Sequence, residues 1–199
     1  MNITRRDIKT LYGDSWLNDE VINFYMNLLM ERGEKSNQNK KYLKVYAMNT
    51  FFIPKLLQSG YSSIKRWTRK VDIFSYDIIP VPVHVGNVHW CMAIIHLKDQ
   101  TIKYYDSMGQ SNHNVLNALE DYLKSESIDK KKQNLDTSNW IIESERNVPQ
   151  QMNCSDCGVF SCMFAEYLTR SHKITFSQTN MPYFRQKMVL EISKGKLLV

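Results

Sequence analysis

The architecture of this chain is set around residues 148–160, which read Val148-Pro149-Gln150-Gln151-Met152-Asn153-Cys154-Ser155-Asp156-Cys157-Gly158-Val159-Phe160. From Gly158 onward, apolar residues recur at helical spacing, so a helix is predicted to begin beside Cys157. Ser155 and Asp156 are residue types that favour a helix N-cap, which places Cys157 in the first turn. Free N–H groups and the helix dipole favour a thiolate there, and the thiolate is the reactive form of cysteine. The pattern therefore predicts a cysteine nucleophile.

The neighbours of Cys157 complete the expected nucleophile site. Gln151 can offer an amide N–H to an oxyanion beside the backbone N–H of Cys157. Gln150 is the adjacent alternative, because only one of two consecutive side chains can point there. Gly158 is expected to let a substrate approach the backbone closely. Asp156 is expected to be a helix cap or a positioning contact, because carboxyl pKa values are too low for a catalytic base.

A base for this nucleophile is predicted on a β-hairpin. Residues 88–97 read as a strand, 98–100 as a turn and 101–107 as the antiparallel return. His89 opens the first strand and Asp106 closes the second, so the hairpin brings an imidazole and a carboxylate to one end. Cysteine, histidine and aspartate in these roles make a nucleophilic site whatever their order in the chain. His84 is the rival base, five residues before His89.

Together with other blocks, these motifs resemble the catalytic domain of the SUMO-specific cysteine proteases, the sentrin and ubiquitin-like-protein protease family. The blocks occur in family order and span nearly all of the chain. They are Trp16-Leu17-Asn18-Asp19-Glu20-Val21, Asn23-Phe24-Tyr25, Asn49-Thr50-Phe51-Phe52, Lys65-Arg66-Trp67-Thr68, Val88-His89-Trp90, Tyr104-Tyr105-Asp106-Ser107-Met108-Gly109, residues 149–158 and Met181-Pro182-Tyr183-Phe184-Arg185.

The resemblance implies roles for individual residues. Its catalytic set maps onto His89, Asp106, Gln151 and Cys157, and its His-Trp block favours His89 over His84 as the base. Trp16 and Trp90 are implied to roof a narrow tunnel for the modifier's Gly-Gly tail, and Asp19 to contact a basic residue near that tail. Two flat indoles would exclude any residue with a Cβ, and tryptophan also offers an N–H donor. Main-chain hydrogen bonds would hold the extended tail.

The sequence departs from the family pattern in two places. The loop 84–89 is one residue longer than the usual spacing, which affects the contact made by His84. Cys154 stands where family members usually carry glycine, three residues before Cys157. One hypothesis is a reversible switch in which oxidation joins the two cysteines and protects the nucleophile. A thioredoxin-like oxidoreductase is the alternative class, but its βαβ pattern is missing, and metal binding fails on ligand count.

Composition is consistent with a single domain over residues 1–199. The chain is 43% hydrophobic, which provides a proper core. Four cysteines, with neither an apolar leader nor a long apolar run, indicate a reducing interior and no membrane span.

The net charge of +6 suggests an acidic partner. SUMO-type modifiers present an acidic face, so the basic residues around Trp67 form a credible docking surface with salt-sensitive association. They are Lys65, Arg66, Arg69 and Lys70. The other interpretation is a solvated face with Trp67 in the core. Nucleic acid is a further alternative, but no recognised motif accompanies the charge.

The remaining periodicity predicts a mixture of helices and strands. Helices are expected over residues 17–30, 51–58, 115–127 and 183–194, strands over 42–48, 73–85 and 140–142, and charged or basic loops over 31–41 and 129–137. Residues 4–10 read only as polar and basic. The resemblance and this count give an α+β domain of the papain-like, adenain-like cysteine protease fold, with a central mixed sheet flanked by helices.

We interpret the sequence as a cysteine isopeptidase and endopeptidase that cleaves after the C-terminal Gly-Gly of SUMO. It is expected to release SUMO from lysines of target proteins and to trim SUMO precursors, as a monomer, without metal or cofactor and without a nucleic-acid or membrane partner. A nuclear or nuclear-envelope site is implied by the resemblance alone. A protease for another ubiquitin-like modifier and a non-catalytic modifier-binding module are the alternatives, and the intact Cys157-His89-Asp106 set argues against the second.

Overall fold

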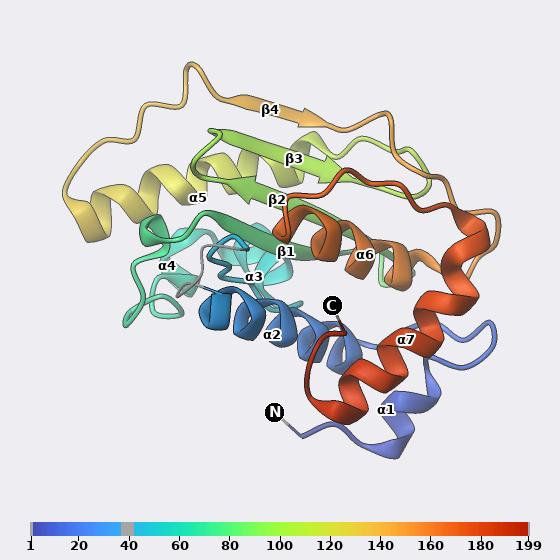
Figure 1. Cartoon of the computed structure of the whole chain (residues 1–199). Coiled ribbons are helices and arrows are strands. Elements are labelled where there is room, and N and C mark those ends of the chain that lie inside the picture. Colours follow the sequence, from blue (N-terminus) through green and yellow to red (C-terminus); the bar gives the residue numbers. More distant parts are fainter. Residues whose placement is uncertain (1, 37–41, 199) are drawn as a thin grey trace.

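The centre of the molecule is a four-stranded mixed sheet (Figure 1). The computed structural model describes residues 2–36 and 42–198. The strands β1 (Ile78–Val85), β2 (His89–His96) and β3 (Thr101–Tyr105) are antiparallel neighbours. The fourth strand, β4 (Ile141–Ser144), pairs in parallel with β3. The predicted hairpin and the predicted mixed sheet are therefore confirmed.

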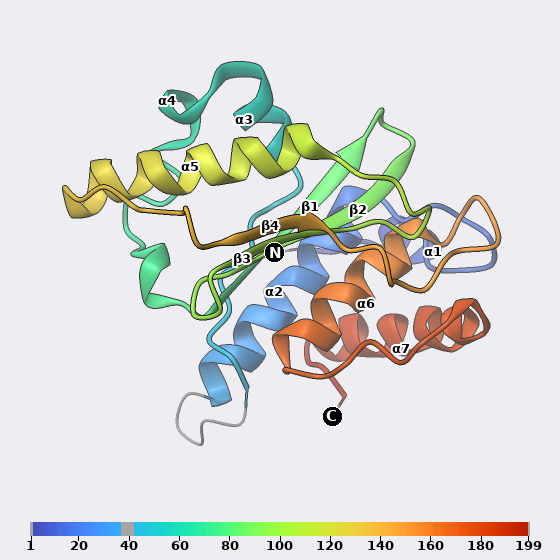
Figure 2. The same cartoon turned by 90° about the horizontal axis from the view of Figure 1, so that it is seen from above.

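Helices cover both faces of this sheet (Figure 2). One layer holds α2 (Asp19–Ser36), α6 (Cys157–Thr169) and α7 (Met181–Lys194), with α1 (Arg5–Lys9) beside it. The other layer holds α3 (Phe52–Ser59), α4 (Tyr61–Ile64) and α5 (His113–Lys131). Two short 3-10 helices, Ile73–Ser75 and Gln178–Asn180, complete the elements of the described residues. This arrangement is the predicted α+β fold.

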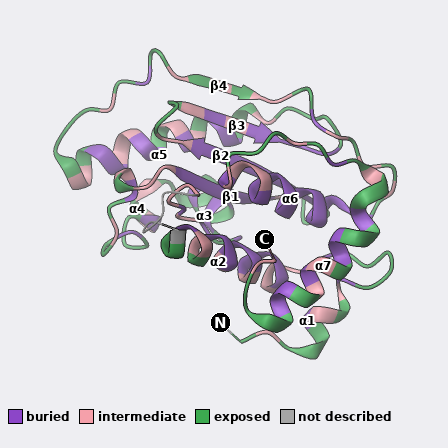
Figure 3. Ribbon diagram, viewed as in Figure 1, coloured by how far each residue is buried: buried purple, intermediate pink, exposed green. Residues whose placement is uncertain are grey.

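The sheet separates two hydrophobic cores because side chains alternate along a strand. In β2, Trp90, Met92 and Ile94 belong to the core shared with α2, α6 and α7. Cys91 and Ala93, between them, belong to the core shared with α3 and α5. Burial is concentrated along β1, β2, β3, α6 and the inward faces of the other helices, whereas β4 is exposed or half-buried (Figure 3). The nucleophile helix therefore packs directly against the strand that carries the candidate base.

Several predicted boundaries are wrong. The helix predicted over 17–30 runs from Asp19 to Ser36, so the predicted loop 31–41 is helical over its first six residues, while residues 37–41 lie outside the described residues. The strand predicted over 73–85 begins only at Ile78, because Asp72 caps a 3-10 turn by accepting a hydrogen bond from the Phe74 N–H. The helix α5 continues to Lys131, into the predicted loop 129–137.

Two further local predictions also differ. Residues 42–48 form only a single parallel bridge, Val45 to Ile78, although a strand was expected. Their partner β1 contains Pro80 and Pro82, which have no N–H to donate to a ladder. The polar segment 4–10 contains α1, whose start is stabilised by a capping box between Thr4 and Asp7.

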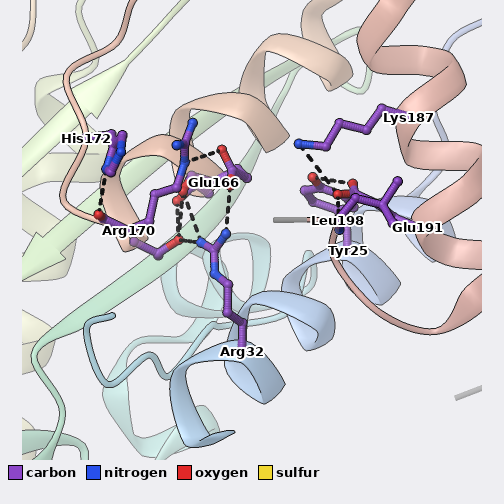
Figure 4. Close-up of polar contacts among 10 residues, drawn as sticks. Tyr25, Arg32, Glu166, Arg170, His172, Lys187, Glu191 and Leu198 are labelled. Atoms are coloured by element: carbon purple, nitrogen blue, oxygen red, sulfur yellow. Dashed lines mark hydrogen bonds and ion pairs between the residues drawn. The ribbon is translucent and has the colours of Figure 1, made fainter. Parts of the chain in front are cut away.

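Two buried carboxylates, Glu166 and Glu191, hold the α2, α6 and α7 layer together through an ion pair and hydrogen bonds (Figure 4). Glu166 on α6 accepts from Arg32 on α2 at 2.7 Å and from Arg170 at 3.0 Å. Glu191 on α7 accepts from the Tyr25 hydroxyl at 2.9 Å and from the Leu198 N–H at 2.8 Å. No helix in the described part of the chain has the length and apolarity that crossing a membrane requires.

Candidate active site

The candidate base and its carboxylate meet at one end of the β2–β3 hairpin. His89 is the first residue of β2, and Asp106 directly follows β3. Because Met92 pairs with Tyr105 in the ladder, the two side chains converge, and His89 Nε2 lies 2.6 Å from Asp106 Oδ1. His89 is 9% exposed and Asp106 is 3% exposed. The predicted convergence of these two residues is confirmed.

A second set of contacts fixes the carboxylate. The loop after β3 turns back, so the backbone N–H groups of Met108 and Gln110 donate to Asp106 at 2.7 and 3.2 Å. Burial by itself raises the pKa of Asp106, but the hydrogen bonds from His89 and these two N–H groups outweigh it and lower the pKa. Asp106 is therefore held as an anion that can orient the imidazole and stabilise its charge.

The charge of His89 follows from the same contact. Burial lowers the pKa of this imidazole, but the hydrogen bond to Asp106 and the neighbouring thiols of Cys157 and Cys91 raise it overall, to about 12. The ring nitrogen Nδ1 is buried and has no hydrogen-bond partner among the described residues. Asp106 thus occupies one nitrogen and leaves the other available to a thiol.

Cys157 is the first residue of α6, where the sequence predicted it. Its side chain is 2% exposed, and Phe160 donates to the Asp156 carbonyl at 2.9 Å, which marks the first helical turn. A backbone N–H at a helix start has no intrahelical partner and can donate to a developing oxyanion. The position therefore supplies both a nucleophile and a hydrogen-bond donor.

Asp156 is a positioning contact, since its side chain makes no capping hydrogen bond. It pairs instead with Arg185 of α7 at 2.8 Å and accepts from Gln178 and Asn153. The buried guanidinium of Arg185 also donates to the carbonyls of Ser155, Ser15 and Thr10. One side chain thus joins the loop before the nucleophile to the segment before Trp16.

Gln151 is tied into the loops around the site. Its side-chain oxygen accepts from the Ser107 hydroxyl at 2.6 Å, and its amide nitrogen donates to the Asn153 carbonyl at 2.6 Å. The amide carries two hydrogens, so one remains for an oxyanion. Gln150 instead donates to the Val148 carbonyl and lies against Gly109. Both side chains touch the loop that follows Asp106, but the side-chain hydrogen bond to that loop, from Ser107, is made by Gln151.

Trp16 and Trp90 line the same cavity of about 430 Å³, together with Asp19 at the start of α2. Trp16 is 48% exposed and Trp90 is 5% exposed. The Trp90 indole N–H donates to the Leu17 carbonyl at 3.0 Å, so the expected free donor is already used. His84 stacks flat on Trp90, with ring centroids 3.9 Å apart and planes 6° apart, so its place in the longer loop is fixed.

Gly158 has a packing role that the sequence did not predict. A Cβ built on it would lie 2.8 Å from the Leu17 Cβ and 3.4 Å from Trp90 Cδ1. The glycine therefore makes room for the segment that carries Trp16.

The predicted docking residues lie in the other layer, after α4. The side chains of Lys65, Arg66, Arg69 and Lys70 are exposed. Trp67 is 38% exposed, with its ring centroid 6.0 Å from that of Phe52, so the interpretation that buries Trp67 in the core is wrong.

Cys91 was not singled out by the sequence. It lies two residues after His89, so strand alternation could have indicated its approach to the imidazole. Ligand atoms of His89, Cys91 and Asp106 all lie within 4.8 Å of one another. The 2.6 Å contact between Nε2 and Oδ1 is too short for two ligands of one zinc ion, which stand about 3.4 Å apart. The group fits a hydrogen-bonded dyad better than a metal site.

Ser107 and Arg185 were also missed as contacts, because their partners are distant in sequence.

A helix-borne cysteine, next to an imidazole that a carboxylate holds across a hairpin, is the arrangement of a cysteine protease. Residues 15–196 match the C-terminal catalytic domain of the Ulp1 protease family. The chain belongs to that family.

Individual relatives agree with this assignment. Over its whole length the chain is 51% identical to a Caenorhabditis elegans sentrin-specific protease and 47% identical to sentrin-specific protease 2 of Homo sapiens, covering 28% and 33% of those proteins. The chain therefore spans about a third of the length of these relatives. The yeast Ulp1 protease domain, solved in complex with the SUMO ortholog Smt3, matches with a TM-score of 0.83 and 30% identity, over 97% of this chain and 83% of that one.

Proposed function

We propose that this domain cleaves the bond after the C-terminal Gly-Gly of a SUMO modifier, both in SUMO precursors and in conjugates with target lysines. The observation that carries the proposal is the 2.6 Å contact between His89 and Asp106, placed beside the first turn of the Cys157 helix. The relatives support the choice of substrate, since two are named sentrin-specific proteases and a third was solved with a SUMO ortholog bound.

In the proposed mechanism, the Cys157 thiolate attacks the carbonyl carbon of the terminal glycine and forms a carbon–sulfur bond. The backbone N–H of Cys157 and the free amide hydrogen of Gln151 donate to the oxyanion. His89 protonates the leaving amine as the carbon–nitrogen bond breaks, which gives a thioester. His89 then takes a proton from water, whose oxygen attacks the thioester and releases the modifier. Asp106 orients the imidazole throughout.

The cavity between Trp16 and Trp90 is the proposed site for the Gly-Gly tail. An extended tail without Cβ atoms can pass between aromatic faces that a larger residue cannot enter. Because the Trp90 N–H is bound to Leu17, we assign this indole a steric role. Asp19, which lines the same cavity, is placed to attract a basic residue near the tail.

The exposed cations around Trp67 are the proposed docking surface for the acidic face of the modifier. Charge complementarity of this kind speeds association and weakens as salt screens it. We also propose that the chain acts as a single catalytic domain and as a monomer. A nuclear or nuclear-envelope location of the full protein is proposed on family resemblance alone, and imaging of the tagged full-length protein would test it.

The first experiment measures release of a C-terminal fluorogenic group from a panel of ubiquitin-like modifiers. We expect turnover of SUMO only, with kcat/KM falling as salt rises from about 0.01 M to about 0.15 M, since the screening length drops from about 30 to about 8 Å. Cleavage of another modifier in place of SUMO would overturn the substrate assignment. Binding of SUMO without any turnover, in the presence of reductant, would indicate a binding module.

Cys157→Ser tests the nucleophile in the same assay. We expect the variant to bind SUMO but to lose kcat by at least about a thousandfold. Cys154→Ser is the matched control, because it removes the nearby exposed thiol and should keep near-wild-type turnover. Near-wild-type cleavage by Cys157→Ser would contradict the assignment.

A further inference from the structure

The docking surface is built on a segment with little backbone structure of its own. After the single turn of α4, residues 65–70 form consecutive turns held by short-range bonds, such as Trp67 N–H to the Ile64 carbonyl at 2.8 Å. All of these residues are exposed except Thr68, which is 1% exposed. Thr68 is therefore the inward anchor between Arg66–Trp67 and Arg69–Lys70.

The side chain of Thr68 is held in turn by a carboxylate on α5. Glu126 of α5 is fully buried, and its two oxygens accept from the Thr68 hydroxyl at 2.5 Å and from the Tyr61 hydroxyl at 2.6 Å. Glu126 forms no ion pair with the described residues. Burial of a carboxylate without a cation is costly, so these two hydroxyl bonds must be retained for the local structure to persist.

Other contacts from α5 support the same segment. The Lys130 ammonium donates to the Lys65 carbonyl at 3.3 Å, and Lys131 pairs with Asp72 beyond the end of the segment. From the same helix, Tyr122 packs edge-on against Phe52 at 4.9 Å, and Phe52 in turn contacts Trp67. The last three turns of α5 thus hold the docking surface from beneath, and α5 lies on the opposite side of the sheet from α6 (Figure 2).

We propose that Glu126 is a positioning residue for modifier recognition. Through Thr68 and Tyr61 it fixes the orientation of Arg66 and Trp67, and thereby sets affinity for the acidic face of the modifier without touching it. This inference rests on the proposed function, because it assumes that residues 65–70 meet the substrate.

Electrostatics alone predicts that neutralising Glu126 strengthens modifier binding, whereas the positioning role predicts that it weakens binding. A negative charge on Glu126, beneath four exposed cations, would weaken their attraction for an acidic partner. If the surface acted only as a sum of charges, Glu126→Gln would tighten binding. If Glu126 positions the segment, the same substitution weakens binding, because the NH2 group that replaces one carboxylate oxygen cannot accept the hydrogen bond which that oxygen received.

The test compares KM and kcat for a SUMO substrate with a fluorogenic C-terminus. Thr68→Val keeps the side-chain shape and the charge of the surface but removes the hydroxyl. We expect Thr68→Val and Glu126→Gln each to raise KM by about tenfold, the effect of one charge-assisted hydrogen bond, with kcat within about twofold of wild type. Thr68→Ser restores the hydroxyl and should restore KM.

Glu120→Gln is the matched control. Glu120 lies on the same helix and, like Glu126, accepts from a threonine hydroxyl. Its donors are Thr137 and Lys124, away from the docking segment. The KM of Glu120→Gln should equal that of wild type. Unchanged KM in folded Thr68→Val, or a lower KM in Glu126→Gln, would overturn the inference while the proposed function stands. Failure of the wild-type domain to cleave SUMO would overturn both.

Discussion

One hydrogen bond, between His89 Nε2 and Asp106, determines which ring nitrogen of the imidazole is available to the nucleophile. It leaves Nδ1 for the thiol and keeps the ring protonated, since the pKa of His89 is raised from its ordinary value of 6.5 to about 12. A protonated imidazole can donate to a thiolate and later to the leaving amine. The protonated form is lost as pH rises through this raised pKa, so the alkaline limit of activity depends on Asp106.

Asp106→Asn is expected to move that alkaline limit to lower pH. Without the carboxylate the pKa of His89 should fall toward its ordinary value, and kcat/KM should drop by at least about a hundredfold. A profile of kcat/KM between about pH 6 and pH 10 measures both effects, with circular dichroism at each pH to confirm that the variant is folded. Because the raised pKa of about 12 places the wild-type limb above this range, a variant that also shows no alkaline limb up to about pH 10 would contradict the role assigned to Asp106.

Cys154 adds a second thiol close in sequence to the nucleophile. Both cysteines are free, with Cys154 exposed and Cys157 buried. In the switch hypothesis, peroxide oxidises Cys157 to a sulfenic acid, the Cys154 thiol displaces hydroxide to form a disulfide, and an added thiol reduces the disulfide. Cys154→Gly should then lose activity that thiols no longer restore. The measurement is the fraction of activity recovered with dithiothreitol after peroxide treatment, and equal recovery in both proteins would reject the switch.

The start of α6 packs closely against β2, α7 and the segment before α2. Gly158 lies against Leu17, whose neighbour Trp16 lines the proposed tail site, and against Trp90 of β2. Arg185 of α7 joins the same two chain segments from the other side through Ser155 and Ser15. The geometry of the nucleophile and the tail cavity is therefore a joint property of α6, α7, β2 and the segment before α2.

Gly158→Ala should disturb this junction. The added methyl group must displace Leu17, so we expect a loss of about 1–3 kcal/mol in the free energy of unfolding. A shift of the cavity wall should also lower kcat/KM about ten- to a hundredfold. Gly33→Ala in α2 is the matched control, because its Cβ would meet the Leu43 carbonyl at 2.8 Å, away from the site. That variant should lose stability but keep kcat/KM, and equal kcat/KM in both variants would refute the argument.

Across the whole molecule, buried carboxylates link the helical layer that carries the nucleophile. Glu191 is 1% exposed, and Tyr25, Leu198 and Lys187 surround it (Figure 4). Burial raises the pKa of Glu191 above its ordinary value of 4.5, despite the hydrogen bonds that lower it. The folded state therefore binds this proton more tightly than the unfolded chain does. The resulting stabilisation is complete below about pH 4.5 and is lost as pH rises through the raised pKa.

Glu191→Gln removes this titration and tests it. Subtracting the variant's free energy of unfolding from that of wild type should give a difference that decreases as pH rises from about 4.5 to about 7. Urea unfolding followed by tryptophan fluorescence at several pH values measures the difference. A difference that is constant with pH would show that Glu191 does not titrate in this way.

The parts of the fold that were predictable depend on local signals. The helix at Cys157 follows from apolar spacing after two cap-type residues, and the hairpin of His89 and Asp106 from two apolar runs around a turn. Even so, the end of α2 and the missing strand at residues 42–48 were not predicted. The end of α2 was missed because charged residues continue a helix as readily as they form a loop. The absence of a strand at residues 42–48 was missed because the prolines that limit its pairing lie in β1, far along the chain.

The amino-acid sequence alone predicted the nucleophile, the base and the orienting carboxylate and identified the family, because each lies in a short, recognisable pattern. Folding in three dimensions settled what the patterns leave open. Asp156 binds Arg185 instead of capping its helix, the Trp90 N–H donates to Leu17, and Glu126 holds Thr68 beneath the proposed docking residues. These contacts join residues tens of positions apart, and the partner of a buried polar group is fixed only when packing excludes water and brings donor and acceptor together.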